Sequence, residues 1–235
     1  IPQRIGPVRS ARISDIEIMS QFGRVAFAYS GAQSKLLPVI AAANLQDLGA
    51  QRQSPTIFTT DPNRVQPYAM VLRADLLMQK IRDDNYQIDS AKSIGFKFGP
   101  LQEGGANTSK AVMLWPAATY SAIWSLDENR WLLSHNNSVN FADSGIVLGP
   151  TTLVIQMVSI TPSEYGDKFG GVTPFSQTVG TGKAYVLRDG QRFVTTWSRA
   201  SAEDGTTFSL ADGTVMNFDP GQIWIALTDK EPDFT

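Results

Sequence analysis

The chain has 235 residues, of which 42% are hydrophobic, so it is long enough for one large domain or two small ones with a proper core. Its 20 basic and 22 acidic residues are mixed along the chain and leave a formal net charge of −2, which gives no global positive field and argues against a nucleic-acid partner. The absence of cysteine and the single histidine exclude disulfides, thiolate nucleophiles and the usual zinc and iron sites. Hard-cation sites made of carboxylates stay open, but no metal site and no cofactor are predicted.

No apolar run approaches the roughly 20 residues that a membrane span needs, so no span is expected in this chain. Ile1 does not begin a signal peptide, and any targeting segment is therefore expected upstream of it.

The N-terminal stretch carries the most informative pattern. Gly6-Pro7 predicts a bend, and Ser14-Asp-Ile-Glu17 has the Ser-x-x-Glu spacing of a capping box, which predicts a helix from near Ser14 to Gly23. Guanidinium groups beside the exposed N–H groups of a helix N-terminus form an anion site, because the donors and the positive end of the helix dipole point the same way. The predicted ligand-binding residues are Arg4, Arg9, Ser10, Arg12, Ser14, Arg64 and Tyr68.

Two further expectations concern these arginines. At least two of them are expected to converge on one solvent-accessible concavity, among Arg4, Arg9, Arg12, Arg24 and Arg64. The alternative is that they form an ion-pair network with Asp15, Glu17 or Asp61.

Strand and helix patterns alternate up to about residue 90. Residues 25–29 and 56–60 predict short buried strands, a helix is expected after Ser34 and before Asn44, and residues 74–82 predict an amphipathic helix. This alternation predicts an α/β layer over residues 1–95.

From residue 96 onward the pattern changes to short strands separated by turns. Strands are predicted at 110–115, 119–126 and 130–133. A two-residue turn at Glu128-Asn129 would place Trp131 opposite Leu126 and Leu133 opposite Trp124. We interpret the resulting apolar face as core, with a sugar-stacking platform as the alternative.

Asp189-Gly190 predicts the type I′ turn of a tight hairpin over residues 183–199. Two-residue closure then sets the cross-strand partners, which are Arg188 with Gln191, Val186 with Phe193, Ala184 with Thr195 and Gly182 with Trp197. Gly182 would leave room for the indole of Trp197.

The remaining elements are predicted with less local support. A second hairpin at Asp212-Gly213 would bring Leu210 opposite Val215, and residues 222–227 predict a central strand after a turn at 219–221. Residues 159–173, with three glycines and one proline, predict a loop or crossover. The expected fold class is α+β, with an α/β N-terminal layer over residues 1–95 followed by a mostly antiparallel β portion over residues 110–235.

Several motifs stand in a fixed order along the chain, namely Gly6-Pro-Val-Arg-Ser-Ala-Arg12, Gly180-Thr-Gly182, Trp197-Ser-Arg199 and Asp212-Gly213 followed by Pro220-Gly221-Gln-Ile-Trp224. With these motifs the chain resembles the YerB-like family of predicted bacterial lipoproteins, a domain of unknown function. The resemblance implies an extracytoplasmic protein, secreted or lipid-anchored to the outer face of the membrane, with no established activity.

The chain departs from the pattern of that family at two places. The segment 27–32 stands where many relatives carry a His before a Gly-rich turn, and Arg64-Val-Gln-Pro-Tyr-Ala69 resembles their Arg-x-x-Pro-His-Asn. Tyr, with a pKa of about 10, does not replace His as an acid or base at neutral pH without a large shift. Any catalysis that relied on those His residues is therefore lost in this chain.

No catalytic residue is predicted. His135, on a polar segment, is interpreted as a solvated side chain, and so are the paired carboxylates at 83–84, 127–128, 203–204 and 229–233. The glycine-rich segments lack the strand-then-helix context of a phosphate loop.

The leading functional prediction is an envelope-associated binding protein that recognises an anionic group, on a small molecule or an envelope polymer, through its arginines. The alternatives are a hydrolase acting on cell-envelope glycans or phosphodiesters and a structural partner-binding scaffold. Residues 1–5 are expected to continue a strand with an open edge, which would pair with an upstream fragment of the same protein or with a second copy.

Overall fold

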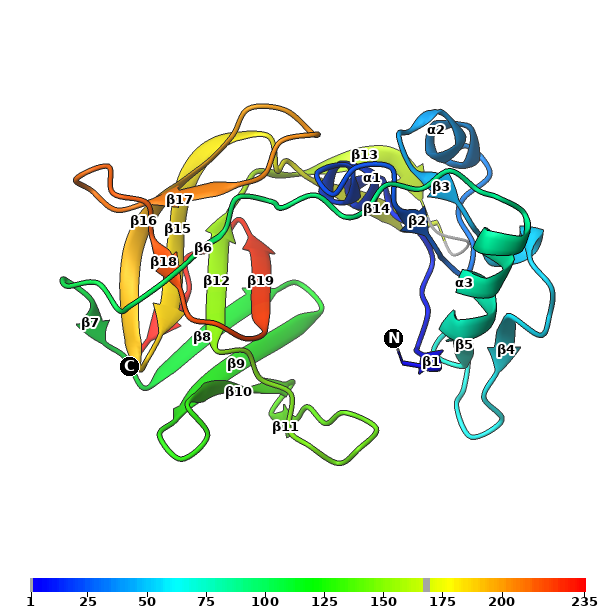
Figure 1. The fold of residues 1–235 in the computed structure, drawn as a ribbon. Coiled ribbons are helices and arrows are strands. Elements are labelled where there is room, and N and C mark those ends of the chain that lie inside the picture. Colours follow the sequence, from blue (N-terminus) through cyan, green and yellow to red (C-terminus); the bar gives the residue numbers. More distant parts are fainter. Residues whose placement is uncertain (1, 167–169) are drawn as a thin grey trace. The chain divides into compact units, whose positions relative to one another are not determined.

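The computed structural model describes residues 2–166 and 170–235. These described residues form two compact units, the first within Ile1–Ser93 and Pro162–Phe175 and the second within Ile94–Thr161 and Ser176–Thr235 (Figure 1). The fold is α+β as predicted, with helices and short strands in the N-terminal portion and mostly antiparallel sheets in the C-terminal portion. None of the described helices has the length and apolar character required to cross a membrane.

The first unit contains a small antiparallel sheet in the order β1-β5-β4, with bounds Arg4–Ile5, Met70–Arg73 and Phe58–Thr60. Helix α3, Ala74–Asp83, begins directly after β5 and packs Leu77 and Ile81 into the core, as the spacing of its apolar residues predicts. Strand β1 lies at the edge of this sheet. The expected strand at 1–5 is thus present at Arg4–Ile5, while Ile1 lies outside the described residues.

A second layer of this unit contains α1, β2, α2, β3 and the 3-10 helix η1, with bounds Ile13–Ser20, Ala26–Phe27, Leu37–Ala42, Gln46–Asp47 and Ala50–Arg52. Strands β2 and β3 pair in parallel. Pro38 stands in the first turn of α2, where the missing N–H has no helical partner to lose.

The start of α1 differs from the prediction. The helix begins at Ile13, Arg12 is its N-cap, and the Asp15 carboxylate accepts the backbone N–H of Arg12 at 2.7 Å. Asp15 therefore has the role that was predicted for Glu17, and Ser14 lies inside the first turn, 9% exposed. Burial raises the pKa of Asp15, and the bond from Arg12 opposes that rise.

Residues 159–173 were predicted as a loop or crossover, and the loop prediction is wrong for the described part of the segment, which forms two strands. Strands β13, Ile160–Gly166, and β14, Val172–Ser176, pair with one another, and residues 167–169 lie outside the described residues. Gly166 N–H donates to Gln33 Oε1 at 3.1 Å, and Tyr165 packs against the core around Tyr29. These contacts explain why this part of the chain belongs to the first unit although it falls within residues 110–235 of the sequence.

The second unit contains two larger sheets. One has the order β11-β10-β9-β8-β20, with bounds Ser138–Val139, Arg130–His135, Ala118–Ser125, Lys110–Trp115 and Asp233–Phe234. The other has the order β17-β16-β15-β12-β19, with bounds Thr207–Ser209, Gln191–Arg199, Gly180–Arg188, Thr152–Met157 and Ile223–Thr228. Strand β7, Ala106–Asn107, also pairs with β16, and β6, Lys97–Phe98, pairs with β18, Asn217–Phe218.

One core lies between the two sheets and a second lies on the far face of the β12–β15–β16 strands. Trp131 and Leu133 from one sheet meet Ile155 and Leu187 from the other in the first core. The alternate residues of the same strands, such as Val154 and Val186, fill the second core with Phe193, Trp197, Phe208, Met216 and Phe218.

The β15–β16 hairpin has the predicted register at all four predicted pairs. Asp189 and Gly190 have φ values of +50° and +69°, which a type I′ turn requires. The β9–β10 hairpin does not follow its prediction, because the turn has four residues and Trp131 pairs with Trp124 and Leu133 with Ala122. Leu126 is consequently left in the turn, 81% exposed.

Two further predictions in this unit are wrong. Leu210 was predicted opposite Val215, but Ser209 is the residue that forms the β-bridge with Val215. The Leu210 N–H donates instead to the Thr214 carbonyl. Strand β19 was expected to be central, but it is the last strand of its sheet and pairs in parallel with β12. Trp224 and Ala226 nevertheless pack on one core and Ile223 and Leu227 on the other, while Ile225 between them is 39% exposed.

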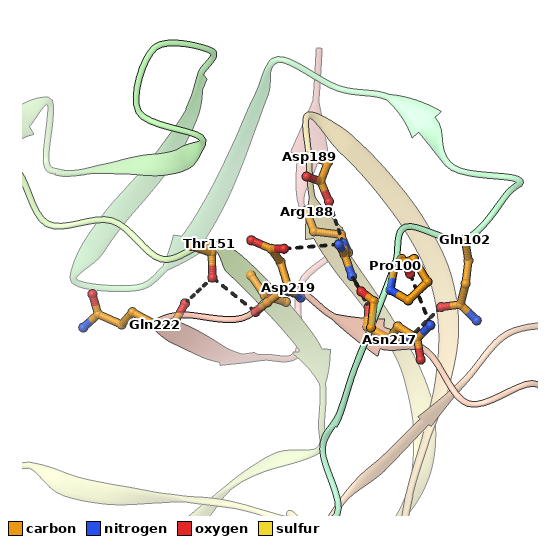
Figure 2. A network of polar contacts seen from close by, with 10 residues as sticks. Pro100, Gln102, Thr151, Arg188, Asp189, Asn217, Asp219 and Gln222 are labelled. Carbon is orange, nitrogen blue, oxygen red and sulfur yellow. Dashed lines mark hydrogen bonds and ion pairs between the residues drawn. The ribbon is translucent and has the colours of Figure 1, made fainter.

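A buried arginine ties the β15–β16 turn to the strands around it (Figure 2). Arg188 is 3% exposed and donates to the carbonyls of Gly99 and Asn217 at 2.9 and 3.0 Å. Its remaining N–H groups reach the carboxylates of Asp189 at 2.6 Å and Asp219 at 3.3 Å. The arginine therefore has a structural role as the centre of this network.

Candidate functional site

The loop between β4 and β5 is folded on itself, and it carries two of the predicted site residues, Arg64 and Tyr68 (Figure 1). Asp61 N–H donates to the Ala69 carbonyl at 2.7 Å, which closes the loop at its base. Arg64 N–H donates to the Asp61 carbonyl at 3.2 Å, and Tyr68 N–H to the Val65 carbonyl at 2.9 Å. These bonds fix the positions from which the side chains of the loop project.

The N-terminal stretch lies beside this loop. Arg4 pairs with Arg73 across β1 and β5, and Val8 N–H donates to the Met70 carbonyl at 2.8 Å. A Cβ at Gly6 would lie 3.2 Å from the Met70 carbonyl oxygen, so glycine permits this close approach. Residues 4–9 therefore follow β5 and the end of the loop that precedes it, although they are about 60 positions away in the sequence.

Asp61 is the point where two arginines from these segments meet. Its Oδ2 atom lies 3.9 Å from Nη2 of Arg4 and 3.6 Å from Nε of Arg64. Both distances exceed the roughly 2.7–2.9 Å of a charge-assisted hydrogen bond. The two arginine side chains are 61% and 41% exposed, whereas that of Asp61 is 18% exposed. The positive groups are thus the more accessible part of this cluster.

Arg9 adds a third cation. Its guanidinium carbon lies 4.6 Å from the ring centroid of Tyr68, which is 52% exposed, and this is a cation–π contact. Stacking uses the flat face of the guanidinium and leaves its N–H edge able to donate. We call Arg4, Arg9 and Arg64, with Asp61 and Tyr68, the arginine cluster.

The other predicted site residues do not share these contacts. Ser14 is buried in α1, Ser10 is half-buried, and Arg12 donates through Nη1 to the carbonyl of Ala11 at 3.3 Å. Arg24 donates to the Gln87 carbonyl and to Gln46 Oε1 at 3.1 and 3.0 Å. Arg4 and Arg64 therefore meet at Asp61, away from the start of α1, as ion pairs of the kind that the alternative expected, and their convergence on a shared concavity stays a prediction.

The second unit contains groups that sequence reasoning did not assign to a site. His135 was interpreted as solvated, and it is exposed, but its ring also lies 4.7 Å from that of Tyr120. Tyr120 in turn contacts Trp115 and Trp224, at centroid distances of 5.8 and 5.3 Å. No local motif links these four aromatic residues, because they lie on four strands, β8, β9, β10 and β19, across about 110 positions of the sequence.

Comparison with known proteins shows similarity over both portions of the chain. Residues 1–87 match the family described as protein of unknown function (DUF3048), N-terminal domain, and residues 111–225 match its C-terminal domain. The crystal structure of the YerB protein from Bacillus subtilis is similar with a TM-score of 0.79 and 16% sequence identity, covering 100% of this chain and 78% of that chain. At this identity the likeness establishes a shared fold. No curated protein matches the chain.

Proposed function

The chain belongs to the YerB-like family of proteins of unknown function, DUF3048, and we propose that it is a binding protein of the bacterial cell envelope that holds an anionic group at the arginine cluster. The observation that carries the proposal is the charge balance of the cluster. Among the residues that the structure describes, the guanidinium groups of Arg4 and Arg64 lie near the carboxylate of Asp61, and that of Arg9 lies over the ring of Tyr68. The cluster as defined above thus contains three cationic side chains and one carboxylate at an accessible surface.

The geometry of the cluster favours an added anion. A phosphate or carboxylate replaces contacts of 3.6 and 3.9 Å with shorter charge-assisted bonds to the N–H edges of the arginines. Exposed contacts of this kind contribute modestly, since water and salt screen them. We therefore expect a dissociation constant between about 1 mM and 1 μM, falling toward the weak end as salt is raised.

We place this activity outside the cytoplasm. Support for the location comes from the resemblance of the chain to a family of predicted lipoproteins. The ligand is then a phosphate or carboxylate carried by a small molecule or by an envelope polymer, and the cluster recognises the anionic group in either case.

The test uses inorganic phosphate and citrate as probes, with amide chemical shifts recorded at low and at physiological salt. Phosphate is expected to shift the amides of residues 4–9 and 61–69 saturably. The double variant Arg4→Gln/Arg64→Gln is expected to weaken binding about tenfold or more. Arg82→Gln, a change at an exposed arginine of α3, serves as the matched control and is expected to have no effect.

The variant Asp61→Asn tests the anion proposal more directly than the double variant. Asparagine keeps the side-chain oxygen that accepts the Asn63 N–H at 3.0 Å, but it removes the negative charge that competes with the ligand. Phosphate affinity is expected to rise several-fold. The proposal is wrong if Asp61→Asn leaves phosphate affinity unchanged, or if saturating phosphate shifts no amide of the cluster.

A further inference from the structure

A cavity of about 220 Å³ lies in the second unit, between strands β9, β10 and β19 and the segment that leads into β12. It is lined by Tyr120, Leu133, Asn140, Leu148, Gly149, Pro150, Gln222 and Trp224. None of these residues carries a formal charge. The cavity and the arginine cluster belong to different units, so a ligand of this cavity is a separate matter from the function proposed above.

Backbone hydrogen bonds hold the walls of this cavity in place. Leu133 N–H donates to the Leu148 carbonyl at 2.9 Å, and Leu148 N–H donates to the Asn140 carbonyl at 2.7 Å. Asn140 N–H donates to the Leu133 carbonyl at 3.0 Å, and Trp131 N–H donates to the Pro150 carbonyl at 2.9 Å. The segment 140–150 is therefore fastened to β10, and the cavity is formed before any ligand arrives, which lowers the cost of binding.

Aromatic side chains form one wall. The rings of Tyr120 and Trp224 lie 5.3 Å apart at 45°, and Trp115 and His135 pack against the other sides of Tyr120. These contacts fix the orientation of both wall residues. An aromatic face carries partial negative charge, so it attracts C–H groups that are polarised by neighbouring oxygens.

Three of the residues that line this cavity carry polar side-chain groups, namely the amides of Asn140 and Gln222 and the Tyr120 hydroxyl. Within residues 2–166 and 170–235, none of the three makes a hydrogen bond to another protein group. Figure 2 shows the Gln222 side chain extending away from the Arg188 network, which contacts this residue only at its backbone carbonyl, through Thr151. Amides and hydroxyls both donate and accept, so these groups match a ligand whose hydroxyls do the same.

From this combination we propose that the cavity binds one neutral sugar ring of a glycan. The apolar face of the ring would lie against Tyr120 and Trp224, and its hydroxyls would bond Asn140, Gln222 and the Tyr120 hydroxyl. None of the lining residues offers an anion a countercharge, and a wholly apolar ligand would leave the three polar groups desolvated without partners, which is costly. The volume is below the roughly 300–1,000 Å³ of pockets for drug-sized ligands, which suits a single ring.

The test titrates the chain with three neutral probes, the trimer of N-acetylglucosamine, maltotriose and phenol, and follows tryptophan fluorescence and amide chemical shifts. At least one of the two glycans is expected to bind saturably and to shift the amides of Asn140, Gly149 and Gln222. The double variant Asn140→Ala/Gln222→Ala is expected to weaken that binding about tenfold, since two hydrogen bonds are lost. Gln79→Ala, on the exposed side of α3, is the matched control.

The remaining outcomes distinguish a failure of the sugar proposal from a failure of the anion proposal at the arginine cluster. Binding of phenol without either glycan would overturn the sugar assignment, and so would glycan binding that the double variant leaves unchanged. A chain that responds to phosphate at residues 4–9 and 61–69 but to neither glycan would leave the anion site in place and end the sugar proposal. Thermal unfolding of each variant verifies that the fold is retained, because both substituted side chains lie at the surface or half-buried.

Discussion

Gly182 and Trp197 are cross-strand partners, and the indole occupies the space that any larger residue at 182 would need. A Cβ built on Gly182 would lie 2.7 Å from Nε1 of Trp197 and 3.1 Å from the Met157 carbonyl oxygen. The same indole N–H donates to that carbonyl at 2.8 Å. The glycine thus permits a hydrogen bond between the side chain of β16 and the backbone of β12.

Gly182→Ala is expected to lower the free energy of unfolding by about 1–3 kcal/mol, because the indole must move off its acceptor. Trp197→Ala is expected to lower it by about 3–5 kcal/mol, as for other buried aromatic residues. Urea denaturation measures both. Gly31→Ala is the control, since a Cβ there meets no atom within 4 Å. Equal midpoints for Gly182→Ala and Gly31→Ala would contradict the packing described here.

A second prediction concerns the stability effects of substitutions in and beside the β9–β10 turn. Leu126 is 81% exposed in this turn, so Leu126→Ser is expected to change the free energy of unfolding by no more than about 0.5 kcal/mol. Leu133 is 3% exposed in the core, and Leu133→Ala is expected to cost about 2–5 kcal/mol. Thermal or chemical denaturation distinguishes the two. A large loss for Leu126→Ser would favour the two-residue turn, in which Leu126 faces Trp131.

Arg188 supports a third prediction. Arg188→Met removes the donors that satisfy two carbonyls and two carboxylates. Breaking a buried ion pair from one side costs about 3–5 kcal/mol, and a loss near the lower value is expected because Asp189 and Asp219 are 37% and 31% exposed. Arg188→Lys should recover less than half of it, since an ammonium lacks the fork geometry. Denaturation measures the free energy of unfolding of each variant, with Arg82→Met, at the surface, as the control. A loss for Arg188→Met that is similar to the loss for Arg82→Met would count against a structural role of Arg188.

The hairpins show which parts of the fold were predictable from sequence. Asp189-Gly190 fixes a register because few residues other than glycine, asparagine and aspartate accept two successive positive φ angles. In the β9–β10 turn, Asn129 alone has positive φ, at +49°, and this is compatible with several loop lengths. The error was two residues in the partner of Trp131, an even number, so Trp124, Trp131 and Leu133 still share the core face.

Strand β19 shows a different limit. Its apolar sequence was interpreted as a sign of a central position in the sheet, but such a run indicates that both faces are buried and does not specify the number of neighbouring strands. The two cores on either side of β19 supply that burial at the end of its sheet.

The candidate sites were predictable to unequal degrees. Arg4, Arg9, Arg64 and Tyr68 were named from sequence, but their meeting point was placed at the start of α1 because Ser14 and Glu17 have capping spacing. Asp61 was named from sequence only as an alternative ion-pair partner, and it lies near Arg4 because β1 pairs with β5. The cavity beside Tyr120 and Trp224 depends on contacts between strands far apart in the chain, and no local spacing records them.

The last prediction concerns Tyr29, in the segment 27–32. This residue is 2% exposed, its hydroxyl donates to Asp47 Oδ1 at 2.8 Å, and Arg52 holds the other carboxylate oxygen at 2.9 Å. Burial first, and the Asp47 carboxylate second, raise the pKa of Tyr29 to about 12. A phenol held neutral in this way acts as a hydrogen-bond donor at physiological pH and not as a base.

The raised pKa links stability to alkaline pH. The unfolded chain loses this proton near pH 10 and the folded chain near pH 12, so the contribution is fully present below about pH 10 and is lost as pH rises toward 12. Tyr29→Phe is expected to lower the free energy of unfolding at pH 7 by about 1.5–3 kcal/mol, because Asp47 loses a bonded donor. The variant should also reduce the decline in stability above pH 10, while a smaller decline persists because burial raises the pKa of Tyr165 as well. Urea denaturation at pH 7, 10 and 11.5 measures both effects, with Tyr68→Phe, at an exposed ring, as the control. Parallel pH profiles for the parent chain and Tyr29→Phe would show that Tyr29 titrates as it does in the unfolded chain, and the bond to Asp47 would then have no role in holding its proton.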